Sequence, residues 1–225
     1  MRTQEALKAK RQAACPGRMT TEGDTKIAVA RHTARMDLDS FWSLVERSAA
    51  VSDDPDERNE WLAEELTGLS DSDLLDFHDH LREQMHRVAN WLTWHAASLI
   101  MRGCSDDGFT GFRAWVVGLG RAAVDSVAEH PDNLADRPEV QRLVGRHMRD
   151  WAEAEWPYSE ELEFVAVEEY HRRFGEQASI YDALEARGDD KPQALQQVDE
   201  VSRDHRDPEE ARNRLPRLAA MFPQG

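Results

Sequence analysis

The residue types that could carry chemistry gather at one predicted helix start in this chain of 225 residues. Ser105 precedes Asp106 and Asp107, and Arg113 follows two helical turns later. The free N–H groups at such a helix start can bind an anion, but the two aspartates make this end electronegative. An acidic site can instead hold a cation or an amine substrate, with Asp106 or Asp107 as a ligand or general base.

Arg113 is a charged residue that the helical pattern places near the core. It lies about 40° from the centre of the apolar stripe formed by Phe109, Phe112 and Val116, so we expect its guanidinium to be at least partly buried. A buried arginine needs a carboxylate or several carbonyls to offset its desolvation. Helical periodicity favours Glu169 as that carboxylate.

Two interpretations of this region stay open. In the functional one, Ser105, Asp106, Arg113 and Tyr170 form the rim of a small polar pocket. In the structural one, Arg113 takes part in a core ion pair and Ser105 is only the N-terminal cap of a helix.

Three histidines, His78, His80 and His86, suggest a metal site at first sight. Residues two apart on a helix point about 200° apart, so His78 and His80 cannot share an ion on one helix. We therefore predict a solvated polar face and no metal site. His95 lies on an apolar stripe, where a hydrogen-bonded core histidine is expected.

The elements that must position these residues are predicted to be helices. Strand patterns of alternating apolar residues are nearly absent, whereas apolar spacing typical of helices recurs along the chain. The segment 90–101 is apolar on all sides, which is typical of a helix buried on all sides. We expect an all-α single domain of about six to eight helices around a buried central helix. The predicted helices span 37–50, 54–67, 70–101 as one long helix, 105–118, 121–130, 139–151 and 159–174, with a loop at 132–138 and short helices beyond 176.

Charge divides the chain into two unlike parts. The whole sequence carries a net charge of −16, but residues 1–35 hold eight basic and three acidic side chains, which leaves an acidic body of −21. Such a body repels phosphate backbones and anionic membrane surfaces, so we predict binding neither to nucleic acid nor to membranes. The expected binding partner is therefore a protein or a small ligand.

The predicted organisation follows the same division. Residues 1–35 lack the apolar segment of a secretory signal, so we expect a disordered basic leader or an over-called start, with a transit peptide as the alternative. Residues 36–175 form the helical core domain, and 176–225 a charged C-terminal helical extension of it. The preference for 24 arginines over 4 lysines is typical of a GC-rich bacterial genome, and a cytoplasmic location is expected.

Short motifs resemble one family. Residues 103–107 read Gly-Cys-Ser-Asp-Asp, 112–115 read Phe-Arg-Ala-Trp, and 215–218 read Leu-Pro-Arg-Leu. Together with Ala-x-Glu-x-Tyr at 166–170, they resemble a bacterial family catalogued as domain of unknown function 4240. The resemblance spans essentially 36–222.

The resemblance implies a small, mainly helical domain, and it supplies no reaction, substrate or catalytic residue. It favours Glu168 where periodicity favours Glu169, and that choice stays open.

Two hypotheses of function follow. The preferred one is a non-catalytic interaction or ligand-sensing module, because no convincing nucleophile–base or metal set is present, and no cofactor is predicted. The alternative is an enzyme with a small polar pocket at the N-terminus of the 105–118 helix, acting on a cationic or metal-bound substrate. The candidate binding residues of the pocket hypothesis are Ser105, Asp106, Asp107, Arg113, Trp115, Glu168 and Tyr170.

Overall fold

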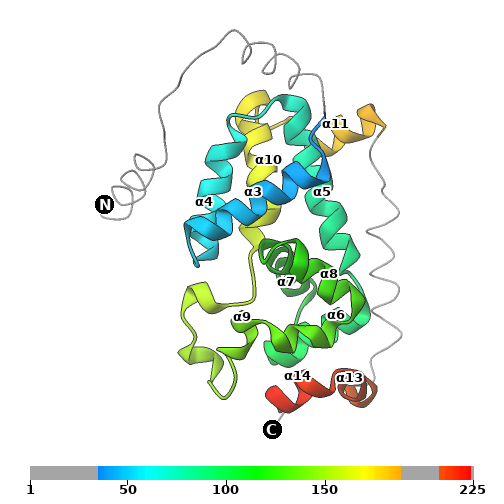
Figure 1. Ribbon diagram of the computed structural model, residues 1–225. Helices are drawn as coiled ribbons and strands as arrows, with labels where there is room; N and C mark the ends of the chain where they lie inside the picture. The colour runs from blue at the N-terminus through cyan, green and yellow to red at the C-terminus, as the bar shows by residue number, and fades with distance from the viewer. Residues whose placement is uncertain (1–34, 189–207, 224–225) are drawn as a thin grey trace. The chain divides into compact units, whose positions relative to one another are not determined.

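Helices account for all the regular structure of the part of the chain that the computed structural model describes, residues 35–188 and 208–223. The predicted all-α fold is therefore confirmed (Figure 1). The described residues belong to one compact unit. Except for Arg35, the predicted leader lies outside the described residues.

The first two helices begin where the sequence predicts. α3 (Leu38–Val51) and α4 (Pro55–Leu66) start after Asp37 and Asp54, whose carboxylates accept backbone N–H groups of the first turn. Proline at the first position of α4 suits a helix start, because its missing N–H has no partner there anyway. Each aspartate thus satisfies a donor that the helix itself leaves unpaired.

The predicted long helix over 70–101 is wrong, because the chain forms two helices there. α5 (Asp71–Arg87) ends at Val88, and α6 (Trp91–Ile100) begins after Asn90. Asn90 is extended, and its Oδ1 accepts the Thr93 N–H at 2.9 Å. The apolar stripe continues across the break because both helices face the same core, so periodicity alone did not reveal the cap.

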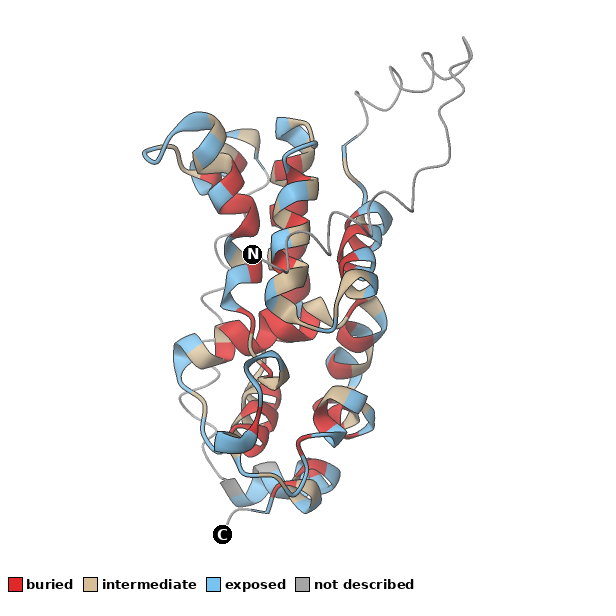
Figure 2. Cartoon of the chain, turned by 90° about the vertical axis from the view of Figure 1, so that its left-hand side faces the viewer, coloured by how far each residue is buried: buried red, intermediate tan, exposed pale blue. Residues whose placement is uncertain are grey.

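The helix with the longest run of buried residues is α7 (Asp106–Gly118), in which 111–117 are all buried. α6 is mostly buried as well but keeps its tryptophans partly exposed, so α7 rather than 90–101 is the more central element. α10 (Glu160–Phe174) packs against α7, α4 and α5, and α11 (Ile180–Arg187) packs against α5. Buried positions cover the inward faces of these helices (Figure 2).

The segment after α7 is less regular than predicted. α8 (Arg121–Glu129) is followed by a 3-10 helix, η1 (Pro131–Asp136), where a loop was predicted. The predicted helix over 139–151 is wrong: α9 (Pro138–Gln141) is a single turn. Gly145 adopts a left-handed backbone with a φ of 73°, which a continuous helix does not allow. Two short 3-10 helices then lead into α10, η2 (Met148–Asp150) and η3 (Glu153–Glu155).

Short C-terminal helices complete the fold, as predicted. α13 (Pro208–Arg214) and α14 (Pro216–Met221) pack against α6, and α14 also packs against η1. The buried Asp132 carboxylate accepts the backbone N–H groups of Arg217 and Leu218 at 3.1 and 3.0 Å, which holds the start of α14 against η1. None of the helices described is both long and apolar enough to span a bilayer.

Candidate functional site

The predicted residues at the start of α7 behave as helix caps. The Ser105 Oγ accepts the Gly108 N–H at 3.0 Å, and Asp106 and Asp107 are exposed in the first turn. Burial, together with the charge of Asp106, raises the pKa of the Cys104 thiol to about 12. The thiol therefore stays protonated at neutral pH, and this end of α7 holds no activated nucleophile of that kind.

Arg113 is buried, as predicted, with 9% of its surface exposed. Its Nη2 donates to the Thr110 Oγ1 at 3.0 Å, and its guanidinium lies 5.0 Å from the centre of the Phe109 ring. Arg113 also acts electrostatically on Glu163 of α10. Burial raises the pKa of the Glu163 carboxyl, and the positive charge of Arg113 opposes this rise. These contacts join Arg113 to its own helix and to α10.

The expected pairing of Arg113 with Glu168 or Glu169 is wrong. Glu169 is 5% exposed and accepts hydrogen bonds from Arg172 Nε at 2.6 Å and Arg173 Nε at 2.7 Å. Glu168 is exposed. Periodicity therefore identified the buried member of the pair correctly, but its partners lie on its own helix, three and four residues further along.

The remaining candidates, Tyr170 and Trp115, do not lie at the rim of one common pocket. Tyr170 is half-buried and packs against the Phe174 ring, with ring centres 4.6 Å apart. Trp115 lies two residues after Arg113, so the two side chains leave α7 in nearly opposite directions. Of the predicted residues, only Trp115 lines the pocket that the chain forms around Arg58.

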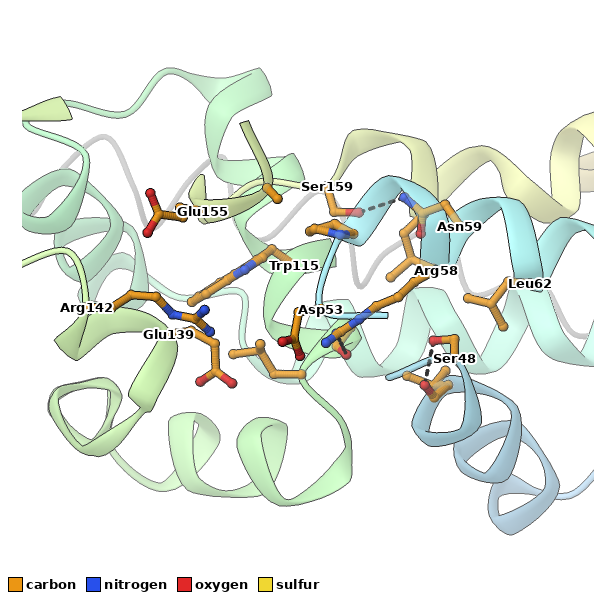
Figure 3. Close-up of a pocket in the computed structure, with 16 residues that line it drawn as sticks. Ser48, Asp53, Arg58, Asn59, Leu62, Trp115, Glu139, Arg142, Glu155 and Ser159 are labelled. Atoms are coloured by element: carbon orange, nitrogen blue, oxygen red, sulfur yellow. Dashed lines mark hydrogen bonds between the residues drawn. The ribbon is translucent and has the colours of Figure 1, made fainter. Parts of the chain in front are cut away.

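That pocket lies at the other end of α7, between α4 and the segment after α8 (Figure 3). Its volume is about 50 Å³. Aliphatic side chains of α3, α4 and α10 form its apolar wall, and the Trp115 indole forms another. The lining residues are Val45, Ser48, Asp53, Pro55, Arg58, Asn59, Leu62, Trp115, Gly118, Leu119, Glu139, Arg142, Ala154, Glu155, Ser159 and Leu162.

A buried amide–hydroxyl pair belongs to the lining. Asn59 Nδ2 donates to the Ser159 Oγ at 3.1 Å, and the two residues are only 7% and 4% exposed. Among the described residues, the Asn59 Oδ1 has no donor and the Ser159 hydroxyl hydrogen no acceptor. The pair therefore offers the pocket one hydrogen-bond acceptor and one donor.

The approach of the chain to α7 at Gly111 fixes the position of Ser159. The Ser159 N–H donates to the Gly111 carbonyl at 3.0 Å. A Cβ on Gly111 would lie only 2.2 Å from the Tyr158 ring, so a side chain at this position would displace that ring.

Arg58 is held in the pocket by two main-chain carbonyls. Its Nε donates to the Ser52 carbonyl at 2.7 Å, and its Nη1 donates to the Gly118 carbonyl at 3.2 Å, so the guanidinium joins α4 to the end of α7. Burial lowers the pKa of Arg58, and the negative charge of Asp53 opposes this change. Figure 3 shows Arg58 beside Asp53 in the pocket.

The two glutamates of the lining are paired to different degrees. Glu155 accepts both Arg146 guanidinium ends at 2.6 and 2.8 Å, and this hydrogen bonding lowers the pKa of Glu155 to about 2. The Glu139 Oε2 lies 3.5 Å from Arg137 Nε, and neither of these buried atoms has a hydrogen-bond partner among the described residues.

The other three charged side chains of the lining, Asp53, Arg58 and Arg142, form no ion pair with any residue that the structure describes. Asp53 and Arg142 act on Arg58 only through space: Asp53 and Glu139 raise the pKa of Arg58, and Arg142 lowers it. The pocket thus presents two positive charges and one negative charge that the described chain leaves unpaired.

The histidines differ from the predicted solvated face. His78 is fully buried, with its ring 5.3 Å from the Tyr181 ring. Burial and the charge of Arg82 lower the pKa of His78 to about 3. His80 bonds the Met36 carbonyl at 3.0 Å. Within residues 35–188 and 208–223, no three His, Cys, Asp or Glu side chains are placed to hold a metal ion.

Most residues of the pocket are absent from the predicted site, although one of them carries a signal in the sequence. Asn59 lies on the same face of α4 as Leu62 and Leu66, which makes it a polar residue on a buried stripe. Nothing in the sequence, however, indicates that Arg142 approaches Arg58, because the irregular segment after α8 brings them together.

Comparisons with known proteins agree with the resemblance seen in the sequence. A search of curated proteins and a search of solved structures found no match. The model of the family described as "Protein of unknown function (DUF4240)" matches residues 36–172, which is more than half of the chain and includes every residue of the pocket lining. The chain therefore belongs to this family.

Proposed function

We propose that this protein is a non-catalytic ligand-sensing module that binds a small molecule in the pocket at the C-terminal end of α7. The observation that carries the proposal is the set of unpaired charges formed by Asp53, Arg58 and Arg142. Arg58 is half-buried, so a partner of opposite charge stabilises it, and Asp53 and Arg142 lie on the exposed side of the pocket, where a ligand can reach them. A bound ligand supplies the partners that the described chain does not.

The lining also supports a binding role rather than a catalytic one. Its hydroxyl groups bond to neutral groups: Ser48 Oγ donates to the Val45 carbonyl at 2.7 Å, and Ser159 Oγ accepts from Asn59. A nucleophilic serine needs a neighbouring base, and neither hydroxyl has one. The enzyme hypothesis concerned the start of α7, where no observation favours it.

The placement of the pocket suits sensing because its walls come from segments far apart in sequence. Arg58 belongs to α4, Trp115 to α7, and Arg142 follows α9. A ligand that contacts Arg58 and Arg142 together binds more tightly when the two segments are correctly packed. Binding therefore shifts the population toward that packing.

A thermal-shift screen with a blocked pocket tests the proposal. Ala154 is exposed at the pocket, so Ala154→Trp should fill the opening without disturbing the core. Ala152→Trp, on the same segment but outside the lining, is the matched control. A ligand at a hundred times its Kd should stabilise the wild-type protein and Ala152→Trp by about 2.7 kcal/mol and Ala154→Trp much less. A screen of charged metabolites in which every stabilising compound acts equally on all three proteins would contradict the proposal.

A further inference from the structure

We infer that the ligand of this pocket is a small zwitterion of the amino-acid type, with its carboxylate between Arg58 and Arg142 and its ammonium group facing Asp53. The inference rests on the proposed function, because it names the ligand class of the same pocket. Three features carry it: the two arginines, the aspartate, and the size of the cavity.

The two arginines specify the anionic end of the ligand. They line the same pocket, and the positive charge of Arg142 lowers the pKa of Arg58, whereas the Glu139 carboxylate on the same side of the pocket raises it. Arg58 Nη2 remains uncommitted after its two bonds to main-chain carbonyls, and the Arg142 guanidinium makes no hydrogen bond to the described chain. A planar carboxylate matches such donors and relieves the repulsion between the two guanidinium groups.

Asp53 specifies the cationic end. Its negative charge raises the pKa of Arg58, and Figure 3 shows the two side chains beside each other in the pocket. An ammonium group brings three N–H donors, of which one can reach Asp53 and another the free Asn59 Oδ1. A simple anion would meet Asp53, and a simple cation would meet both arginines. A ligand with both charges avoids both repulsions.

The cavity sets the size of the enclosed group. A volume of about 50 Å³ corresponds to roughly three to five water-sized spheres, given about 10–15 Å³ for each. That is the size of an amino group, an α-carbon and a carboxylate. Leu62, Leu162 and Trp115 provide an apolar surface for a short aliphatic side chain.

Titration calorimetry of the full chain with three matched probes tests the inference. L-alanine carries both charges, propionate lacks the amine, and ethylamine lacks the carboxylate. L-alanine should bind about tenfold or more tightly than either analogue, which corresponds to about 1.4 kcal/mol. Equal binding of propionate would overturn the inference in favour of a plain anion site, and equal binding of ethylamine in favour of a cation site.

Variants of exposed residues identify which end of the probe meets which side chain. Asp53→Asn should weaken L-alanine about tenfold and leave propionate unweakened, whereas Arg142→Gln should weaken both. Both residues are exposed, so both variants should fold. Asp107→Asn, an equally exposed aspartate at the opposite end of α7, should change neither affinity. Loss of L-alanine binding in Asp107→Asn but not in Asp53→Asn would overturn the inference.

The result also separates this inference from the proposed function. If none of the three probes binds, the inference fails. The proposed function survives that result when the screen finds another ligand that Ala154→Trp blocks, and it fails as well when the screen finds none.

Discussion

Glu169 on α10 and Asp53 in the pocket are both carboxylates that lie near arginine, but only Glu169 is paired with arginines within the protein. Glu169 accepts short hydrogen bonds from Arg172 and Arg173, and Arg173 also donates to Asp71 and to main-chain carbonyls. Asp53 has no such bond within the described chain. The charges around Glu169 are paired within the protein and hold helices together. The charges of the pocket are unpaired within the described chain, and this difference separates a structural network from a binding site.

The largest effect on stability is expected in the ion-pair network around Glu169. Glu169→Gln leaves Arg173 with only 13% of its side chain exposed and without its main counter-charge. It should therefore lower the free energy of unfolding by about 3 kcal/mol in urea titrations. Glu168→Gln, the exposed neighbour, is the control and should change it by less than about 0.5 kcal/mol. Equal effects of the two variants would show that the network contributes nothing specific.

A buried group without any charge partner gives the second prediction. Burial holds His78 neutral in the folded protein down to about pH 3, whereas the unfolded chain takes up a proton below about pH 6.5. Stability should therefore be complete above this window and fall within it by about 1.4 kcal/mol per pH unit as the pH is lowered.

Comparing the wild-type protein with His78→Leu isolates the contribution of His78 to the pH dependence of stability. Between about pH 7 and pH 5, the wild-type protein should lose about 2 kcal/mol more unfolding free energy than His78→Leu. The measurement is urea denaturation at each pH. Parallel pH profiles would mean that the imidazole is accessible to protons, contrary to its burial between α5 and α11.

The neutral pair of the pocket should have an intermediate effect. Ser159→Ala leaves the buried Asn59 Nδ2 without an acceptor. It should destabilise the protein by about 1 kcal/mol, because water in the pocket replaces part of the lost hydrogen bond. Denaturation of the ligand-free protein measures the loss. A loss of about 3 kcal/mol or more would place this pair with the structural network instead.

The smallest effect on stability is expected at the unpaired charges of the pocket. Without ligand, Arg142→Gln should change the free energy of unfolding by less than about 0.5 kcal/mol, because the guanidinium is exposed and makes no bond to the described chain. A loss above about 1 kcal/mol would show that Arg142 already has a partner within the protein. The contrast between the two groups of charges would then fail.

Local signals predicted the helices well because caps act within one turn. Asp37, Asp54, Ser70 and Ser105 each begin a helix where the sequence indicated, each with a side-chain bond to a backbone N–H. Asn90 was missed because its cap lies inside an apolar stripe that does not change phase.

The site could not be predicted in the same way, because it depends on contacts between distant segments. At the start of α7, Ser, Asp and Arg form a conspicuous motif, yet the structure uses Ser105 as a cap and packs Arg113 on its own helix. At the other end, Arg58 and Arg142 are separated by 84 positions in the numbering. The single turn of α9 and the left-handed Gly145 shape the segment that brings Arg142 to the pocket.

Two tryptophans report separately on the two ends of α7, and their indole N–H signals in nuclear magnetic resonance spectra test the central claim most directly. Trp115 lines the pocket, whereas Trp94 stacks on Phe109 and donates its Nε1–H to the Cys104 carbonyl at 3.1 Å. Trp115→Phe and Trp94→Phe assign the two signals. On titration with L-alanine, the Trp115 signal should shift and saturate while the Trp94 signal stays in place. A shift of Trp94 alone, or of neither signal, would contradict the account.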